Sequence, residues 1–463
     1  MKHHFTSHIS QALCTLLFGV AVLLFFGMAY PHHLHYQEQY QLFLFDSNYV
    51  WDIIRMPGGV ADLLGRFCTQ FFQFAWVGAA IIAVLLSLVQ LLTLRLAKWG
   101  WLYGLSFVPS FLLWLFLLDE HALLGGIWAV LFTQFAVWGL VRLPDGWVRR
   151  IMIIIAFFIL YWIAWGGSHY YRYPTIFPTL LYVAWVTAVI LPFLVRITGT
   201  VLRDTISKGN WIIRTVPSVL LVAAIMGTVV WKNANFKAEK VMQYDFMARH
   251  QQWNRILETI NTEKPNNQIG VTVQNLALAM HGQLINHLLD YNQNGIAGLL
   301  PDVQSDATSP LPTAEVHYQL GMISVAQRTV FEAQEAILDF QKSGRCYKRL
   351  AQTNLILGSY EVARKYLMAL QKTLFYRDWA NETLPLLGNE EAIAKHPEYG
   401  RLRQMVCDED YYFSDHVTPE MLEGLYACNT DNHLALEYLK AYYVLTGDRE
   451  NYAKLLLQNS AQQ

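Results

Sequence analysis

The sequence predicts an all-α protein in two parts, a transmembrane helical bundle followed by a helical domain outside the membrane. The 463 residues are 54% hydrophobic and 15% charged, and these figures average two unlike parts. Up to about Trp231 one apolar run follows another, whereas from Lys232 charge returns and no run could cross a bilayer. In the second part aromatic or aliphatic residues recur at helical spacing. We therefore expect a transmembrane domain over 1–231 and a helical-repeat domain over 232–463.

Transmembrane helices explain the apolar runs of the first part. A helix needs about 20 mostly apolar residues to cross the roughly 30 Å hydrocarbon core of a bilayer. Seven charge-free runs approach or exceed this length, at 9–31, 67–94, 99–118, 122–141, 151–167, 174–195 and 215–231. The first is interpreted as an anchor, because the sequence FFGMAYPHH at its end is a poor signal-peptide cleavage site. The prediction is a seven-helix bundle.

The cations between these runs predict the orientation of the bundle. Short cytoplasmic loops carry an excess of Lys and Arg. With the N-terminus in the cytoplasm, the inner face receives Lys2, Arg95, Lys98, Arg142, Arg149, Arg150, Arg196, Arg203, Lys208 and Arg214. The outer face receives only Arg55, Arg66 and Arg172. An odd number of crossings then places residues 232–463 outside, which is the periplasm of a bacterium with two membranes, and the bundle in the cytoplasmic membrane.

The first outside loop contains a predicted surface helix over about 36–56. Leu42, Phe45, Tyr49 and Ile53 recur there at helical spacing, and the segment stops at the Pro-Gly-Gly sequence of 57–59. Its aromatic residues favour the headgroup region of a membrane. Two interpretations remain open: an amphipathic connector packed over the bundle, or one wall of a functional pocket.

Polar residues of the outside loops are the candidate site. Glu38 follows the first predicted span, Asp119 and Glu120 occupy the turn between the third and fourth, and His169 and Arg172 lie in the next outside turn. An acid there could deprotonate an acceptor hydroxyl or hold a divalent metal, and Arg172 with His169 could bind a lipid phosphate. The alternative is that these are ordinary solvated turns.

The five cysteines suggest one disulfide. Cys14 and Cys68 lie in membrane runs, whereas Cys346, Cys407 and Cys428 fall in the exported part, where disulfides persist. Cys407 with Cys428 is the preferred pair, although an odd count leaves one thiol over. No cysteine or histidine spacing resembles a zinc site, and no cofactor is expected.

Four glycines of the second part indicate helical hairpins. Gly358 is followed by Ala363 and Leu367 at the spacing of a tetratricopeptide repeat, and weaker versions of the pattern surround Gly321, Gly282 and Gly447. In such a unit Gly ends the first helix in a left-handed turn, and small residues let the paired helices approach. Stacked hairpins of this kind bind peptides or proteins. The alternative is an ordinary all-helical core.

The chain resembles an uncharacterised family of bacterial multi-pass membrane proteins with a domain of unknown function. The matching segments are HYQEQYQLFLFDS with MPGG and TQFF, then NLALAMHGQL, HYQLGMISVAQRTVFEAQEA and NLILGSYEVARKYLMALQKTLFYRDWA. They lie in both parts of the chain. The resemblance implies a membrane bundle with an exported helical domain and supplies no activity.

The architecture also resembles membrane glycosyltransferases of the GT-C type, which use polyprenyl-phosphate sugar donors. That resemblance implies Glu38 as the catalytic base, with Asp119 or Glu120 assisting a divalent metal or the acceptor. The first outside loop departs from the pattern of that class, because it has no adjacent pair of acids. Fold-level analogy does not establish an activity.

Two functions follow as hypotheses. The first is an envelope interaction or scaffold protein that contacts membrane lipids and binds a protein or peptide on its helical repeats. The alternative is a transferase that uses a polyprenyl-linked sugar. A transporter is disfavoured because the predicted spans contain no Asp, Glu, Lys or Arg. Nucleic-acid binding is not expected, since the sequence has no basic patch.

Overall fold

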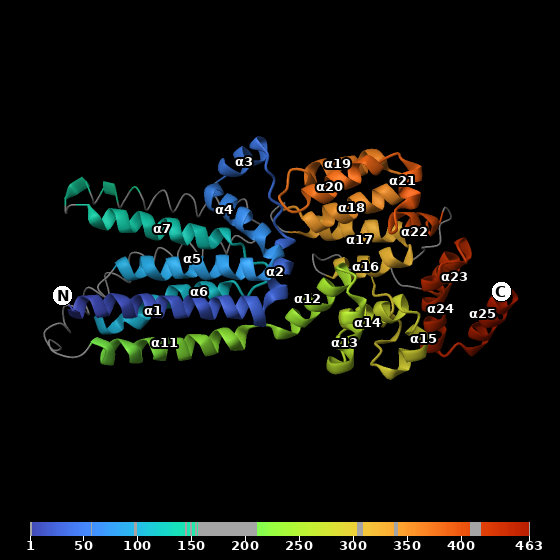
Figure 1. Cartoon of the computed structure of the whole chain (residues 1–463), viewed down its shortest axis with the longest axis horizontal. Coiled ribbons are helices and arrows are strands. Elements are labelled where there is room, and N and C mark those ends of the chain that lie inside the picture. Colours follow the sequence, from blue (N-terminus) through green and yellow to red (C-terminus); the bar gives the residue numbers. More distant parts are fainter. Residues whose placement is uncertain are drawn as a thin grey trace. The chain divides into compact units, whose positions relative to one another are not determined.

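The computed structural model describes residues 2–56, 58–96, 100–143, 211–302, 309–337, 341–407 and 418–462, with a few positions between 146 and 155. All regular elements among these residues are helices, so the all-α class is confirmed. The chain divides into two compact units, Met1–Phe236 and Lys237–Gln463 (Figure 1). From the sequence, the boundary between the two parts was expected near residue 232.

The first unit contains long apolar helices and, at one end, a group of short ones. Its helices are α1 (Lys2–Leu24), α2 (Pro31–Glu38), α3 (Ser47–Ile54), α4 (Gly59–Thr69), α5 (Ala75–Leu96), α6 (Val108–Phe116), α7 (Gly125–Arg142) and α11 (Trp211–Asn233). A π-helix over Phe25–Ala29 continues α1, and 3₁₀-helices over Gln70–Gln73 and Gly100–Phe107 precede α5 and α6.

Three helices of the described residues are long and apolar enough to cross a membrane. They cover Ile9–Ala29, Ala75–Leu96 and Val216–Asn233. Tyr103–Phe116 and Gly125–Ala136 are apolar but shorter. The described residues therefore contain three full-length candidate spans where the sequence predicted seven for the whole chain. The predicted spans over 151–167 and 174–195 lie outside the described residues, apart from a few positions up to 155.

Two predicted boundaries in this unit were wrong. The span expected over 67–94 begins only at Ala75, because Phe74 has extended backbone and separates α5 from the preceding 3₁₀-helix. The surface helix expected over 36–56 is broken by the non-helical segment 41–46. After that break Asp46 starts α3 by accepting hydrogen bonds from the backbone N–H groups of Asn48 and Tyr49.

Long-range contacts show that α1 and α5 are antiparallel. Thr15, near the start of the apolar part of α1, donates to Gln90 Oε1 near the end of α5, at 2.8 Å. At the other end of the pair, Gly27 lies against the ring of Trp76, where an added Cβ would be 2.6 Å from a ring carbon. The chain therefore crosses the bundle in α1 and returns in α5.

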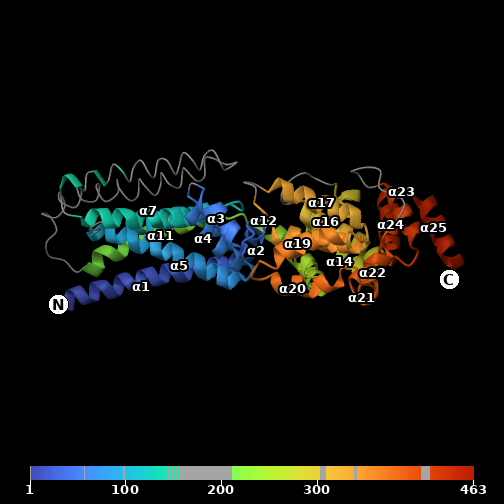
Figure 2. The ribbon, with the colours of Figure 1, turned by 90° about the horizontal axis from the view of Figure 1, so that it is seen from above.

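The next passes continue this alternation. The third pass consists of the 3₁₀-helix Gly100–Phe107 and α6. The hydroxyl of Tyr103 donates to Gln11 O at 3.2 Å, so this pass starts beside the start of α1. The third pass ends beside α2, and α7 starts against α4, where Gly125 contacts Gly65. The last helix of the first unit, α11, starts at the N-terminal end of the bundle. Figure 2 shows α1, α5, α7 and α11 running along one axis, with α3 and α4 at the end away from the N-terminus.

Uncharged polar side chains are buried inside this bundle. Gln90 and Gln134 are both 0% exposed. Gln90 donates to Ser106 Oγ at 3.1 Å, and Gln134 donates to Thr93 Oγ1 at 2.9 Å, so both amides link neighbouring helices. Inside a bilayer the hydrophobic effect gives helices little reason to associate, because lipid tails are as apolar as the helix surfaces. Hydrogen bonds between helices then help to hold the bundle together. Because these side chains carry no charge, the absence of Asp, Glu, Lys and Arg from the apolar runs did not indicate this polar layer.

The second unit consists mostly of short helices. They are α12 (Phe236–Arg249, beginning one residue before the unit), α13 (Trp253–Glu263), α14 (Gln268–Met280), α15 (Leu284–His287), α16 (Pro310–Leu320), α17 (Ile323–Ala336), α18 (Gly344–Ile356), α19 (Tyr360–Leu370), α20 (Arg377–Thr383), α21 (Glu390–Lys395), α22 (Tyr399–Gln404), α23 (Pro419–Cys428), α24 (His433–Thr446) and α25 (Arg449–Gln462). Short 3₁₀-helices cover Leu288–Asp290, Gly295–Gly298 and Leu384–Leu386.

Helix hairpins with glycine turns form the middle of this unit. Gly321 has φ of 89° between α16 and α17, and Gly358 has φ of 79° between α18 and α19. Gly282 and Gly447, at 64° and 73°, also have the left-handed conformation expected from the sequence. The buried Ala363 lies in the interior formed with the neighbouring helices. Helix hairpins are a broader class than the tetratricopeptide repeat, and the fold is established at that broader level.

Candidate functional site

The candidate site is a pocket at the end of the first unit that lies away from the N-terminus. It is partly enclosed and has a volume of about 10 Å³, which is about the space of one water molecule. Three segments line it: the C-terminal end of α2 with the residues after it, the end of α4 with the following 3₁₀-helix, and the turn between α6 and α7. The lining residues are Gln37, Tyr40, Gln41, Thr69, Phe72, Glu120, His121, Ala122 and Leu123.

Hydrogen bonds from α2 to the α6–α7 turn join two segments that the sequence places in different loops. His33 Nε2 lies 2.8 Å from the carbonyl oxygen of Leu117. Gln37 Nε2 donates to the carbonyl oxygens of Asp119 and Ala122, at 3.1 and 3.5 Å. Burial lowers the pKa of His33 to about 4, so the ring is neutral at pH 7 and its Nε2–H is the donor. The two loops thus form one wall.

The opposite wall comes from α4. The hydroxyl of Thr69 lies 3.2 Å from Gln41 Oε1 and also 2.9 Å from the carbonyl oxygen of Gly65. One turn before Gly65, Asp62 forms a buried ion pair with Arg66, with 2.9 Å between Oδ2 and Nε. These contacts anchor the segment after α2 on a helix whose own charged residues are paired. The pocket therefore presents amide and hydroxyl groups together with the carboxylate of Glu120 and the imidazole of His121.

The structure places the predicted acids in three different surroundings. Glu120 is half-buried and lines the pocket. Asp119 is exposed at the rim of the α6–α7 turn, beside His121. Glu38 is the last residue of α2 and is only 6% exposed, but it is not a lining residue. His169 and Arg172 lie outside the described residues. Among the described residues, no group of three or more His, Cys, Asp or Glu side chains could hold a metal ion.

Most of the pocket lining was missed because it is uncharged. Gln37 and Gln41 are the first and last residues of the segment QEQYQ, and both are almost fully buried. Amides in an otherwise aromatic loop next to a membrane span were the available signal. Glu38, the acid of the same loop, was the residue predicted from the sequence, rather than the two glutamines.

Asp119 and His121 form an electrostatic pair at the rim of the pocket. His121 Nδ1 lies 3.5 Å from Asp119 Oδ1, and the backbone N–H of His121 donates to the same oxygen at 2.8 Å. The side-chain hydrogen bond from His121 lowers the pKa of Asp119, and the same interaction raises the pKa of His121. The pair contributes its full stability between pH 3.8 and pH 6.5, the ordinary pKa values of Asp and His. The contribution is lost as the pH falls through the lowered pKa of Asp119 or rises through the raised pKa of His121.

We therefore expect the pKa of His121 to decrease in Asp119→Asn. The neutral amide cannot stabilise the imidazolium, so the proton is lost at lower pH. An NMR titration of histidine-labelled full-length protein would measure this shift. Glu120→Gln is the comparison variant and should lower the same pKa by less, since Glu120 acts on His121 only through its charge. An unchanged His121 pKa in Asp119→Asn would contradict the pairing.

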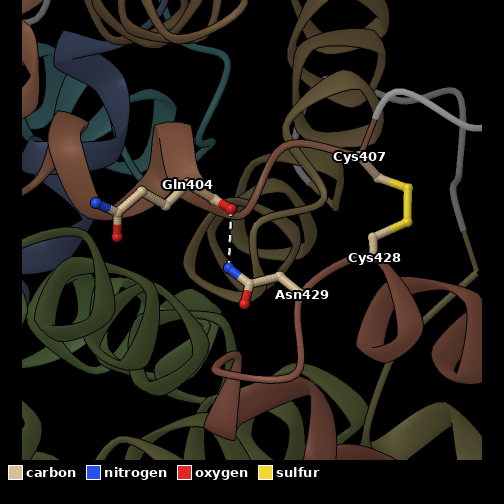
Figure 3. Close-up of a disulfide and its surroundings, with 4 residues drawn as sticks. All are labelled: Gln404, Cys407, Cys428 and Asn429. Carbon is tan, nitrogen blue, oxygen red and sulfur yellow. Dashed lines mark hydrogen bonds between the residues drawn. A yellow bond between two sulfur atoms is a disulfide. The ribbon is translucent and has the colours of Figure 1, made fainter.

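A disulfide in the second unit joins two segments distant from the pocket residues in sequence. Cys407 is bonded to Cys428, with 5.6 Å between their Cα atoms (Figure 3). This is the pair preferred from the sequence. Next to it, Asn429 Nδ2 donates to the carbonyl oxygen of Gln404 at 2.8 Å, which links the same two segments. Cys346 is free and buried, and burial raises the pKa of its thiol to about 11.

The fold defines the class of the protein. It is an all-helical protein that has helices of membrane-spanning length, together with a second compact helical unit. The chain belongs to the family of unknown function DUF6057, whose family model matches residues 7–169 and 164–462. No curated protein and no solved structure matches the chain. The family resemblance is thereby confirmed, whereas the tetratricopeptide and GT-C resemblances receive no support from these comparisons.

Proposed function

We propose that this is a seven-pass protein of the bacterial cytoplasmic membrane whose second unit lies in the periplasm and binds a protein or peptide partner. The alternation of the passes supports the crossing number. α7 ends, and α11 begins, at the same end of the bundle as the N-terminus, so the intervening chain contributes an even number of crossings. Two apolar runs, 151–167 and 174–195, are available there. Five described passes and these two make seven.

The proposed topology has a direct test. A compartment reporter fused after Gln463 should report the periplasm, and one inserted after Gly209 should report the cytoplasm. The reason is that an odd number of crossings separates the N-terminus from the second unit, with the cations on the inner face. A cytoplasmic signal at Gln463 would contradict both the seven-pass topology and the periplasmic location of the second unit. Reversed signals at both positions would mean that the bundle has the opposite orientation.

The disulfide provides a second test of the same compartment. We expect Cys407 and Cys428 to resist alkylation in intact cells until a reductant is added, because disulfides persist outside the cytoplasm. Mass spectrometry of the alkylated full chain would identify the protected positions. In Cys428→Ser, Cys407 should become reactive without reduction. Alkylation of Cys407 in unreduced wild-type protein would place this segment in a reducing compartment.

The observation that carries the binding role is the pair of helix hairpins α16–α17 and α18–α19. Stacked hairpins present continuous surfaces, and proteins built from them commonly bind peptides or proteins. On α19, Met368 is 53% exposed and Val362 is 41% exposed, so this helix has apolar side chains available for a partner.

Site-specific photo-crosslinking in living cells tests this role with the full chain. A crosslinking residue at Met368 should yield a discrete adduct, whereas one at Leu457 of α25 should not. Leu457 is a suitable control because it is also apolar and 72% exposed. Identical adducts at both positions, or none at Met368, would contradict a specific partner surface on α19.

A lipid-linked sugar transferase is the second candidate, and the pocket is the observation that favours it. Glu120 and the segment after α2 line one cavity next to apolar helices, where a polyprenyl chain could remain in the bilayer. In this mechanism a carboxylate takes the proton of an acceptor hydroxyl, the oxygen attacks the anomeric carbon, and polyprenyl phosphate leaves. A divalent metal bound by Asp119 or Glu120 could assist the departure of the phosphate.

Two isosteric variants separate the candidate bases. Glu120→Gln should abolish formation of a glycan or lipid product if the pocket carboxylate is the base, and Glu38→Gln should do so if the base is the residue chosen from the sequence. Protein abundance must match wild type in both. Wild-type amounts of every such product in both variants would remove the case for a transferase.

A further inference from the structure

Helix α4 has an apolar face on its outer side. Val60, Leu64 and Phe67 follow one another at four- and three-residue spacing, so they form one stripe along the helix. Val60 is 51% exposed and Phe67 is 37% exposed, and Leu64 between them is half-buried. A helix that faces water normally carries polar residues on its outer side. This stripe carries none.

The two charged residues of α4 are held away from that stripe. Arg66 Nε and Nη2 lie 2.9 and 2.8 Å from Asp62 Oδ2, and the two side chains are only 12% and 5% exposed. Charged residues within a membrane protein commonly pair with each other and face its interior, because an unpaired charge in a bilayer is costly. The outer side of α4 therefore offers no charge to which a soluble partner could pair.

The other sides of α4 are packed against protein. Gly65 lies against Gly125 at the start of α7, and a Cβ at Gly59 would be 1.9 Å from the carbonyl oxygen of Ile53, so α3 folds back closely on α4. On α3 the exposed residues Asn48, Asp52 and Arg55, the last of which caps the helix, form a polar face. The two neighbouring helices thus present surfaces of opposite polarity.

The apolar surface of α4 continues into a candidate membrane span. The ring of Phe67 packs edge-to-face against Phe71, with 5.6 Å between the ring centres. Farther along, Phe74, Val77 and Val84 have exposed side chains, the last two on α5. No charged residue occurs between Phe67 and Leu94. Exposed apolar side chains on a helix of membrane-spanning length face lipid, and the stripe on α4 extends the same surface.

We propose that α4 is embedded in one leaflet of the membrane, with Val60, Leu64 and Phe67 against lipid acyl chains and the polar face of α3 toward water. The inference rests on the proposed membrane location of the first unit. At 1.5 Å per residue the 11 residues of α4 measure about 16 Å, about half of the hydrocarbon core, so the helix can enter a leaflet without crossing it.

The leaflet is the one at the end of the bundle away from the N-terminus, where α3 and α4 lie (Figure 2). In the proposed orientation this is the periplasmic leaflet. Lipid fits the stripe better than a protein partner does, because protein interfaces surround their apolar centre with a polar rim. The lipid-contacting helix of the first outside loop is therefore α4 and not the surface helix expected over 36–56.

Fluorescence quenching on the full chain can test this placement. A fluorescent amino acid is introduced by codon suppression at Val60, Phe67, Asn48 or Val84, and each chain is reconstituted into vesicles of phosphatidylethanolamine and phosphatidylglycerol. The quenchers are lipids with a nitroxide near the headgroup or at mid-chain, and iodide on both sides of the membrane. Labels at Val60 and Phe67 should be quenched best by the nitroxide near the headgroup and several-fold less by iodide than the label at Asn48.

Val84 of α5 separates this inference from the proposed membrane location. Its label should be quenched best by the mid-chain nitroxide, since Val84 lies within the candidate span Ala75–Leu96. If Val84 meets lipid but iodide reaches Val60 and Phe67 as freely as Asn48, the embedding of α4 is refuted while the membrane location stands. Protection of Val60 and Phe67 from both quenchers would also refute it, because protein would then cover the stripe.

A label at Val84 that no lipid nitroxide quenches would refute the membrane location of the first unit and the embedding of α4 together. Each labelled chain must melt at the wild-type temperature. Phe67 belongs to a group of packed aromatic rings, so its replacement could disturb the fold. If that chain fails to fold, the contrast between Val60, where the side chain is more exposed, and Asn48 decides.

Discussion

Asp245→Ala should lower the free energy of unfolding by about 3–5 kcal/mol, the range found when one partner of a buried ion pair is removed. The side chains of Arg345 and Asp245 are only 9% and 12% exposed. Removing the carboxylate leaves the Arg345 guanidinium without its two hydrogen bonds in a site that water reaches poorly. Thermal or denaturant unfolding of the full chain, followed by tryptophan fluorescence, would measure the loss.

An exposed pair in the same unit provides the matched control. Arg328 and Glu332 lie one helical turn apart on α17, with side chains 49% and 26% exposed. Glu332→Ala should therefore change stability by less than about 1 kcal/mol. Replacing both partners of the buried pair, as in Asp245→Leu with Arg345→Met, should cost less than Asp245→Ala alone, since no buried charge is left. Equal effects of Asp245→Ala and Glu332→Ala would refute the assigned burial.

Gly65→Ala should destabilise the first unit by about 1–3 kcal/mol or more, the usual cost of overpacking. A Cβ at Gly65 would lie 2.4 Å from the backbone nitrogen of Gly125 and 2.7 Å from its Cα. Both are backbone atoms, so no rotamer change can relieve the clash and α4 must move away from α7. The yield of folded protein in detergent and its thermal midpoint would report the effect.

Gly227→Ala is the control for Gly65→Ala. Gly227 lies in α11, where a Cβ would meet no heavy atom within 4 Å. The substitution should raise stability by roughly 0.5–1 kcal/mol, because alanine has the higher helix propensity and its Cβ has space here. If the two variants melt at the same temperature, the close approach of α4 and α7 is not part of the folded state.

Sequence reasoning was strongest where the signal is local. The apolar runs predicted the existence and type of α1, α5 and α11, and the glycine pattern predicted the left-handed turns at Gly321 and Gly358. It was weaker at boundaries. The predicted surface helix was too long, because Asp46 starts a new helix within it. The predicted second span continued through Phe74, because a charge-free sequence does not mark where a helix stops.

The sequence by itself determined the helical class, the apolar helices and their glycine turns, because spacing, caps and hydropathy act among neighbouring residues. Only the tertiary structure decided which polar groups meet. Gln37 reaches Asp119 across 82 residues, and Arg345 reaches Asp245 across 100. Many polar pairings are compatible with one composition, and the packing of the helices selects among them. That packing brought Glu120 rather than Glu38 into the pocket lining.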